Sequence, residues 1–201
     1  MQSEKKLANY EVLLCLTGGI ACYKIADLAS KLTQAGAKVT VAMTENAMRF
    51  VGPVTFTALT GRPVFTTLWQ GGEDFRTRHI SLTERADLMV IAPATANIIA
   101  KIAHGLADDL VSTMALAAAG SCDILIAPAM NSRMLSAPAT QENLAKISDW
   151  AGFETIGPAS GNLACGTAGP GRMVESAELL EQITKMLTDK PAKKSASETR
   201  I

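Results

Sequence analysis

The sequence predicts a single α/β domain in which helices cover both faces of a doubly wound parallel sheet. Short apolar runs alternate along the chain with longer segments whose apolar residues recur at helical spacing. The runs are nearly continuous, which is typical of strands that are buried on both faces. A length of 201 residues suits one domain, and 48% hydrophobic residues with only 4% aromatic ones indicate a core of Ala, Leu, Ile and Val.

The order of the expected elements supports this fold class. The expected strands are residues 11–16, 38–43, 88–92, 123–127 and 153–156. The expected helices are residues 20–35, 97–103, 110–119, 140–151 and 176–188. In the first helix Ile25, Leu28, Ala29 and Leu32 lie at positions i, i+3, i+4 and i+7, and Gly36 supplies a stop. Strand and helix alternate as in a flavodoxin-like or Rossmann-like three-layer sandwich.

Composition divides the chain into three parts. We expect a polar N-terminal arm over residues 1–10 and the α/β domain over residues 11–188. Residues 189–201 have no large apolar side chain before the last position and are expected to be a disordered tail.

Charge and cysteine usage exclude several classes of function. A formal net charge of +0 argues against a nucleic-acid partner and against an anionic membrane surface. No apolar run reaches the roughly 20 residues that span a bilayer, and no signal-peptide core is expected near the N-terminus. The cysteines at 15, 22, 122 and 165 have no CxxC spacing, so we expect reduced thiols, a cytoplasmic location and no metal site.

The loop after the first strand reads Thr17-Gly18-Gly19-Ile20. Its glycines let backbone N–H groups approach a ligand, and the following helix N-terminus favours a phosphate. The loop matches neither GxGxxG nor GxxxxGK. Glu45 lies near the usual place of a ribose-binding acid, so this loop alone leaves open a nicotinamide dinucleotide site or a simple tight turn.

The loop after the third strand, residues 92–98, combines small residues with the hydrogen-bonding groups of Thr95 and Asn97. Helix capping by either side chain is a common alternative. Because capping does not explain the run of small residues, we favour a ligand-binding loop.

The segment Pro128-Ala129-Met130-Asn131-Ser132-Arg133-Met134 runs off the fourth strand. Ligands bind at such strand ends in open α/β sheets, and Asn131 offers both an amide donor and a carbonyl acceptor. A structural turn in which Asn131 caps the next helix is the alternative.

Two further residue types could carry chemistry. His104 lies at an expected helix end, where capping accounts for it, and spacing alone does not distinguish His79. Cys165 lies in a loop with glycines on both sides, which we expect to be a flexible lid. A cysteine in a small loop usually has no chemical role.

Four motifs give the chain a family resemblance. In chain order they are His79-Ile80-x-Leu82 followed by Ala86-Asp87, the 92–98 loop, the 128–134 segment, and Ala164-Cys165-Gly166-x-x-Gly169. Over about residues 11–187 the chain resembles the homo-oligomeric flavin-containing cysteine decarboxylases. It departs from their pattern at Leu135, where an aromatic residue is usual, and this leaves substrate choice open.

The resemblance implies a flavin mononucleotide (FMN) enzyme. In the members that it resembles most, oxidised flavin takes two electrons from the thiol-bearing carbon of 4′-phosphopantothenoylcysteine, giving a thioaldehyde. Loss of CO₂ and reduction of the resulting enethiol then yield 4′-phosphopantetheine for coenzyme A biosynthesis.

The resemblance also implies roles for individual residues. His79 would orient the carboxylate and assist proton removal, Asn131 would hold the carboxylate or amide, and Cys165 would protonate the enethiolate. The implied flavin contacts are Gly18, Gly19, Ile20, Thr44, Thr95, Ala96, Asn97, Ile98 and Ala129. The implied substrate contacts are Asn131, Met134, Ala164 and, for the phosphate, Arg172.

Related activities remain as alternatives. A peptidyl-cysteine decarboxylase of lantibiotic type shares the flavin loops, although its product needs no reduction by a cysteine motif. A flavin prenyltransferase fits the 128–134 and Cys165 motifs poorly. A non-catalytic FMN-binding regulatory relative is a further possibility. Family members form homotrimers or homododecamers and work with a phosphopantothenate–cysteine ligase, either fused or separate.

Overall fold

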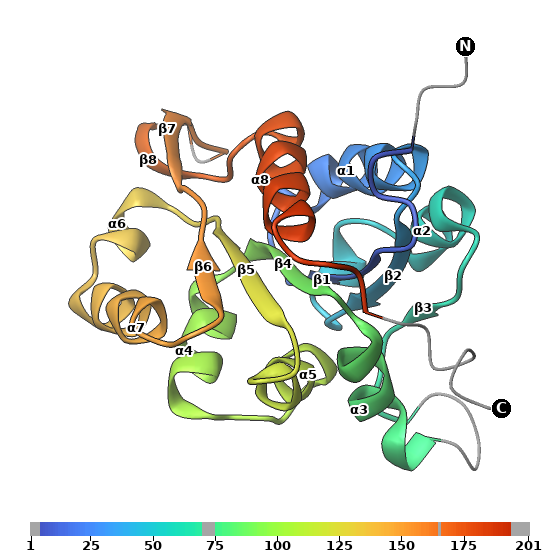
Figure 1. The fold of residues 1–201 in the computed structure, drawn as a ribbon. Helices are drawn as coiled ribbons and strands as arrows, with labels where there is room; N and C mark the ends of the chain where they lie inside the picture. The colour runs from blue at the N-terminus through green and yellow to red at the C-terminus, as the bar shows by residue number, and fades with distance from the viewer. Residues whose placement is uncertain (1–4, 70–74, 165, 194–201) are drawn as a thin grey trace, which may run out of the picture.

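The computed structural model describes residues 5–69, 75–164 and 166–193, with the backbone alone for residues 75–79. It is a three-layer α/β sandwich around a six-stranded parallel sheet (Figure 1). Along the sheet the strands are β3 (Val64–Phe65), β2 (Lys38–Met43), β1 (Glu11–Leu16), β4 (Leu88–Ala94), β5 (Asp123–Pro128) and β6 (Phe153–Thr155). The predicted fold class is confirmed.

Helices cover both faces of the sheet (Figure 1). One face carries α1 (Cys22–Gln34), α2 (Pro53–Thr60) and α8 (Ser176–Thr188). The other carries α3 (Phe75–Arg85), α4 (Ala96–His104), α5 (Leu110–Ala118) and α7 (Pro138–Ser148). Short helices η1 (Ala47–Arg49) and α6 (Ser132–Leu135) follow β2 and β5.

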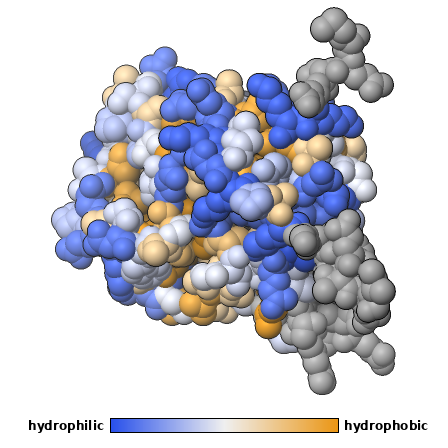
Figure 2. All heavy atoms as spheres, viewed as in Figure 1, coloured by the Kyte–Doolittle hydropathy of each residue, from blue (hydrophilic) through white to orange (hydrophobic). Residues whose placement is uncertain are grey.

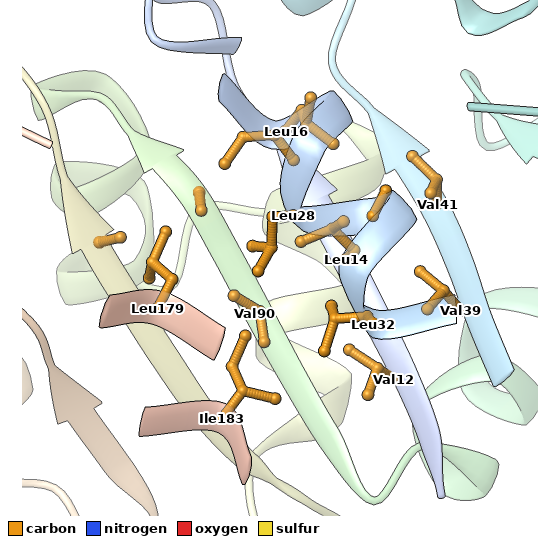
Figure 3. Close-up of a cluster of buried hydrophobic side chains, with 14 of the residues drawn as sticks. Val12, Leu14, Leu16, Leu28, Leu32, Val39, Val41, Val90, Leu179 and Ile183 are labelled. Atoms are coloured by element: carbon orange, nitrogen blue, oxygen red, sulfur yellow. The ribbon is translucent and has the colours of Figure 1, made fainter. Parts of the chain in front are cut away.

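The strands form because their continuous apolar sequence fills two cores at once. In β1, Leu14 and Leu16 enter the core under α1 and α8, whereas Leu13 and Cys15 enter the opposite core. Figure 3 shows the first core, in which Leu28 of α1 and Leu179 of α8 lie over the strands. Burial of each leucine side chain contributes about 1.5–3 kcal/mol. Because alternate residues of β1 point into opposite cores, both faces of the sheet must be covered by helices.

Several predicted elements match the structure closely, and others were missed. The strands at 11–16 and 38–43 and the helix at 176–188 have the predicted bounds. The sequence reading missed α2, β3 and α3. It also predicted an irregular loop around Cys165. In the structure, β7 (Ala159–Asn162) and β8 (Ala168–Arg172) pair there as an antiparallel hairpin.

The topology places a ligand crevice at one edge of the sheet. The chain winds from β1 outward to β3 and then returns to start β4 on the other side of β1. Ligands bind at such a switch point, beyond the carboxyl ends of the strands. The loops after β1, β4 and β5 therefore lie together at this edge.

The termini pack elsewhere. In the predicted N-terminal arm, Leu7 is fully buried and its N–H donates to the Ala35 carbonyl oxygen at 2.9 Å. In the part of the predicted tail that is described, Lys193 Nζ donates to the carbonyl oxygens of Glu84, Ala86 and Ser121 at 3.1, 2.7 and 2.6 Å. The rest of that predicted tail, 194–201, lies outside the described residues.

Hydrophilic residues dominate the face of the molecule seen in Figure 2, and apolar residues form small groups between them. The helices within the described ranges are too short or too polar to span a lipid bilayer.

Candidate functional site

A cleft of about 730 Å³ opens at the carboxyl ends of β1, β4 and β5. Small residues of the three strand-end loops line it: Gly18, Gly19, Ala96 and Ala129. Longer side chains come from α1, from the β5–α6 loop and from the β7–β8 hairpin. They include Tyr23, Lys24, Met130, Asn131, Met134, Leu163 and Arg172.

Thr17 joins the β1 and β4 loops beneath this cleft. Its buried hydroxyl donates to the Pro93 carbonyl oxygen at 2.6 Å, and the Thr95 N–H donates to Thr17 Oγ1 at 3.1 Å. Gly18 allows the next close approach, because a Cβ there would lie 2.4 Å from Asn46 Cβ. The floor of the cleft is therefore fixed by local packing and hydrogen bonds.

In the loop after β4, helix capping and cleft lining, the two alternatives left by the sequence, occur together. Thr95 Oγ1 accepts from the Ile98 N–H at 3.3 Å and so caps α4. Thr95 and Ala96 also line the cleft. Capping and cleft formation are compatible because the cap uses the hydroxyl of Thr95 while the small neighbours leave space above it.

Six of the nine predicted flavin contacts line the cleft: Gly18, Gly19, Ile20, Thr95, Ala96 and Ala129. The other three lie outside its lining. Ile98 is buried in the core under α4 and α5, Asn97 is exposed, and Thr44 Oγ1 accepts from the Ala47 N–H at 3.3 Å after β2.

Asn131 lines the cleft and also caps α6, since its Oδ1 accepts from the Arg133 N–H at 2.8 Å. This bond fixes the orientation of the side-chain amide. Met134 and Ala164 line the cleft as well, whereas Leu135 is buried and lies outside its lining. Leu135, where the sequence departs from the family pattern, is therefore a buried residue that does not line the cleft.

The β7–β8 hairpin is attached directly to the Asn131 loop. The Met130 N–H donates to the Gly171 carbonyl oxygen at 2.9 Å, and Ser132 Oγ donates to the Pro170 carbonyl oxygen at 2.6 Å. Gly171 has a φ of +125°, and a Cβ there would lie 2.2 Å from the Met130 carbonyl oxygen. Only glycine fits this approach.

Charged side chains gather at one corner of the cleft. Lys24 Nζ lies 2.7 Å from Glu175 Oε1, and Arg172 pairs with the same oxygen. Lys24 first, and then Arg172, hold the pKa of the Glu175 carboxyl below its ordinary value. Among the described residues that line the cleft, no other side chain carries a formal charge.

Of the three predicted catalytic residues, only Asn131 has a side chain within the described part of the chain. His79 belongs to α3, but its side chain lies outside the described part of the chain. Cys165 lies outside the described residues; in the sequence it falls between β7 and β8. The roles of His79, Asn131 and Cys165 stay predictions.

The sequence reading missed Tyr23, Lys24, Met173 and Glu175 in the lining. Tyr23 and Lys24 follow Ile20 by three and four residues, so helical spacing places all three on one side of the first turn. That spacing was the available signal. For Glu175 the sequence contains no such signal, because its contact with Lys24 depends on how α8 packs against α1.

Comparison with known proteins identifies the family. A family model described as Flavoprotein matches residues 1–188. The chain belongs to the flavoprotein family. This flavoprotein is 43% identical over 185 residues to the coenzyme A biosynthesis bifunctional protein CoaBC of Vibrio vulnificus (strain YJ016), covering 92% of this chain and 45% of the relative. It thus spans less than half the length of that bifunctional relative.

A shorter relative and two solved structures resemble the flavoprotein over nearly their whole length. This chain is 38% identical over 177 residues to a probable phosphopantothenoylcysteine decarboxylase of Streptococcus mutans, covering 88% of this chain and 98% of the relative. A PPC decarboxylase mutant complexed with pantothenoylaminoethenethiol superposes with a TM-score of 0.79 at 28% identity, covering 90% of this chain and 100% of that one. The FMN-dependent cysteine decarboxylase SpaF gives 0.76 at 30% identity, covering 90% and 97%. The predicted family resemblance is confirmed.

Proposed function

We propose that this flavoprotein binds FMN and decarboxylates 4′-phosphopantothenoylcysteine to 4′-phosphopantetheine in coenzyme A biosynthesis. One observation carries the proposal: Asn131 and the glycine-rich β1–α1 turn line the same cleft, at the switch point of the sheet. Similarity to the Streptococcus mutans decarboxylase over 98% of that relative supports the choice of substrate.

The residues of the cleft fit FMN. The N-cap position of α1 is Ala21, whose side chain makes no capping hydrogen bond. The first N–H groups of α1, those of Cys22, Tyr23 and Lys24, already donate to the carbonyl oxygens of Gly19, Ile20 and Ala21. The backbone of the Gly18-Gly19 turn before this helix would therefore be the part that approaches a phosphate. The cleft volume of about 730 Å³ lies within the range of ligand pockets. When bound, flavin supplies two-electron oxidation of the thiol-bearing carbon and the later reduction.

The chain's own residues would position the substrate and move its protons. Asn131, whose amide is oriented by the Arg133 N–H, would hold the substrate carboxylate or amide. His79 would orient the carboxylate and accept a proton, as a group that titrates near neutrality can. Cys165 would donate its thiol proton to the enethiolate.

The test is an anaerobic absorbance spectrum of the purified protein before and after addition of 4′-phosphopantothenoylcysteine, with mass analysis of the product. We expect a flavin spectrum, release of CO₂ and formation of 4′-phosphopantetheine. A flavin-loaded protein that leaves this substrate intact would contradict the proposal and direct the search to cysteine-ended peptides. A colourless protein that FMN cannot reconstitute would favour a regulatory role.

Replacement of Cys165 tests its assigned step. We expect Cys165→Ser to release CO₂ but to accumulate the oxidised enethiol product, because the proton donor of the last reduction is lost. Mass analysis distinguishes this product from 4′-phosphopantetheine by two hydrogens. Normal product at the normal rate would show that Cys165 has another role.

We also propose that the protein forms a homotrimer or homododecamer and works with a phosphopantothenate–cysteine ligase, fused or separate. The exposed apolar side chains of Ile20, Tyr23 and Met134 at the cleft support association there. Light scattering of the flavin-loaded protein gives the oligomeric state, and a monomer would contradict this part of the proposal.

A further inference from the structure

Two cations share one carboxylate at the charged corner of the cleft. Lys24 Nζ and Arg172 both pair with Oε1 of Glu175. The corner therefore has one more positive than negative charge, in a cleft whose other described lining residues are uncharged. A surplus cation that is largely removed from water favours an anionic ligand.

Lys24 is the more enclosed of the two cations, with only 14% of its side chain exposed. It lies on α1 and is held beside the start of α8, because Ser176 Oγ donates to the Lys24 carbonyl oxygen at 3.0 Å. Figure 1 shows α1 and α8 side by side. The ammonium thus projects from a fixed part of the fold.

Arg172 is placed by the hairpin. Its side chain crosses β7, where a Cβ on Gly161 would lie 2.9 Å from an Arg172 terminal nitrogen. Within the described residues, Arg172 Nε is buried without a hydrogen-bond partner. A buried donor of this kind gains from an added acceptor.

The N-terminus of α8 reaches the same corner. Glu175 is the N-cap residue of this 13-residue helix, and its side chain makes no capping hydrogen bond. The first N–H groups of a helix favour negative charge. The Glu175 side chain is half exposed, so it can turn toward solvent and leave both cations to another anion.

We infer that Lys24, Arg172 and the N-terminus of α8 form a subsite for the phosphate monoester of the substrate, with Glu175 as a competing internal anion. The inference rests on the proposed function. A phosphate monoester carries between about −1.5 and −2 charges at neutral pH and three acceptor oxygens, which suits two cations and a helix N-terminus. The hairpin that supplies Arg172 also supplies Ala164, a predicted substrate contact, so we assign the phosphate to the substrate and not to the flavin.

The test compares equilibrium binding of 4′-phosphopantetheine and pantetheine to the flavin-loaded protein by calorimetry. We expect Lys24→Gln to weaken binding of the phosphorylated compound by about 10- to 100-fold and to leave pantetheine binding unchanged. Lys31→Gln is the matched control, because Lys31 lies on the same helix and pairs with Asp27 away from the cleft. It should bind both compounds as the wild type does.

Glu175→Gln gives the opposite expectation. Loss of the competing carboxylate should tighten binding of 4′-phosphopantetheine about 3- to 10-fold. If the three charges only hold α1, β8 and α8 together, Glu175→Gln will instead weaken binding of both compounds, and the inference is wrong.

Other outcomes separate this inference from its premises. If Lys24→Gln loses affinity for FMN relative to riboflavin but still discriminates 4′-phosphopantetheine from pantetheine, the corner serves the flavin phosphate and the inference is wrong. Equal wild-type affinity for the two compounds also overturns it. Failure of the wild type to decarboxylate 4′-phosphopantothenoylcysteine would overturn the proposed function itself.

Discussion

Thr17 shows how one buried hydroxyl can organise a binding edge. It bonds both to the Pro93 carbonyl oxygen and to the Thr95 N–H, so the loops after β1 and β4 cannot move independently. The sequence suggested a glycine turn at this place, but it gave no indication that the preceding threonine joins two strands that are 76 residues apart.

Thr17→Val keeps the shape of the side chain and removes both hydrogen bonds. We expect a loss of about 1–3 kcal/mol in the free energy of unfolding, because a buried carbonyl oxygen and a partly buried N–H lose their partner. Urea denaturation measures this loss. Thr57→Val is the control, since the Thr57 hydroxyl bonds to Pro53 on an exposed helix turn. Equal stability of the two variants would contradict the role of Thr17.

Cys122 gives a pH dependence at the residue scale. Burial raises the pKa of its thiol to about 11, although the nearby Lys193 ammonium opposes the shift. The unfolded thiol ionises near pH 9, so unfolding is favoured increasingly above that pH until the folded thiol ionises as well. Stability from this group is complete below about pH 9 and should fall by up to about 1.4 kcal/mol per pH unit between pH 9 and 11.

Cys122→Ala tests this pH dependence, because it removes one ionising group and should make the loss between pH 9 and 11 less steep; burial also raises the pKa of the Cys15 and Cys22 thiols, which remain. Urea denaturation at several pH values measures the slope. The same slope in both proteins would assign the pH dependence to other groups.

At the scale of elements, the predictable parts are those whose own sequence decides their structure. The strands β1 and β2 were predicted with their bounds because short runs of mainly apolar residues, after a charged first residue in each strand, leave few alternatives. In α2, by contrast, the fully buried side chain is Phe56 alone, and the described side chains of α3 bury only Leu82 and Thr83. Neither helix shows an apolar stripe along its sequence.

The β7–β8 hairpin escaped prediction for a different reason. Its strands contain Gly161, Gly169 and Gly171, which are unfavourable in isolated strands. Contact with the Asn131 loop requires Gly169 and Gly171, since a Cβ on Gly169 would lie 2.7 Å from Ser132 Oγ and one on Gly171 would lie 2.2 Å from the Met130 carbonyl oxygen. Gly161 instead leaves room for the Arg172 side chain. The signal was therefore in the tertiary contact and not in the local sequence.

Gly171→Ala tests the attachment of the hairpin. The added Cβ would overlap the Met130 carbonyl oxygen in a backbone conformation that disfavours side chains. We expect a loss of about 1–3 kcal/mol in stability, together with faster hydrogen exchange in the hairpin. Gly52→Ala is the control, because Gly52 has a φ of −74° and an added Cβ would meet only ordinary contacts. Unchanged exchange in Gly171→Ala would argue against the attachment.

At the scale of the whole molecule, residues 189–193 connect elements at the edge of the sheet opposite the cleft. The Lys193 ammonium reaches carbonyl oxygens at the end of α3, before β4 and before β5. Composition alone suggested disorder from residue 189, because the segment is polar and has no large apolar side chain before its last position. It could not show that a lysine fits a cluster of carbonyl oxygens supplied by three separate segments.

Lys193→Met should lower the free energy of unfolding by about 0.5–1.5 kcal/mol, since three carbonyl oxygens, only one of them in a partly buried hydrogen bond, lose a charged donor. Lys190→Met is the matched control. Lys190 forms an exposed ion pair with Asp123, and such pairs contribute about 0–1 kcal/mol. If both variants lose the same stability, the carbonyl cluster has no special role.

The close backbone contact between Met130 and Gly171 has a consequence for protein engineering. The two stretches, about forty positions apart in the chain, form one structural unit, because neither can change shape without the other. A designer who wishes to alter the substrate range should transplant residues 128–135 and 157–172 together from the same donor. Chimeras that exchange only one of the two would combine mismatched surfaces and lose the alignment of the asparagine with the hairpin.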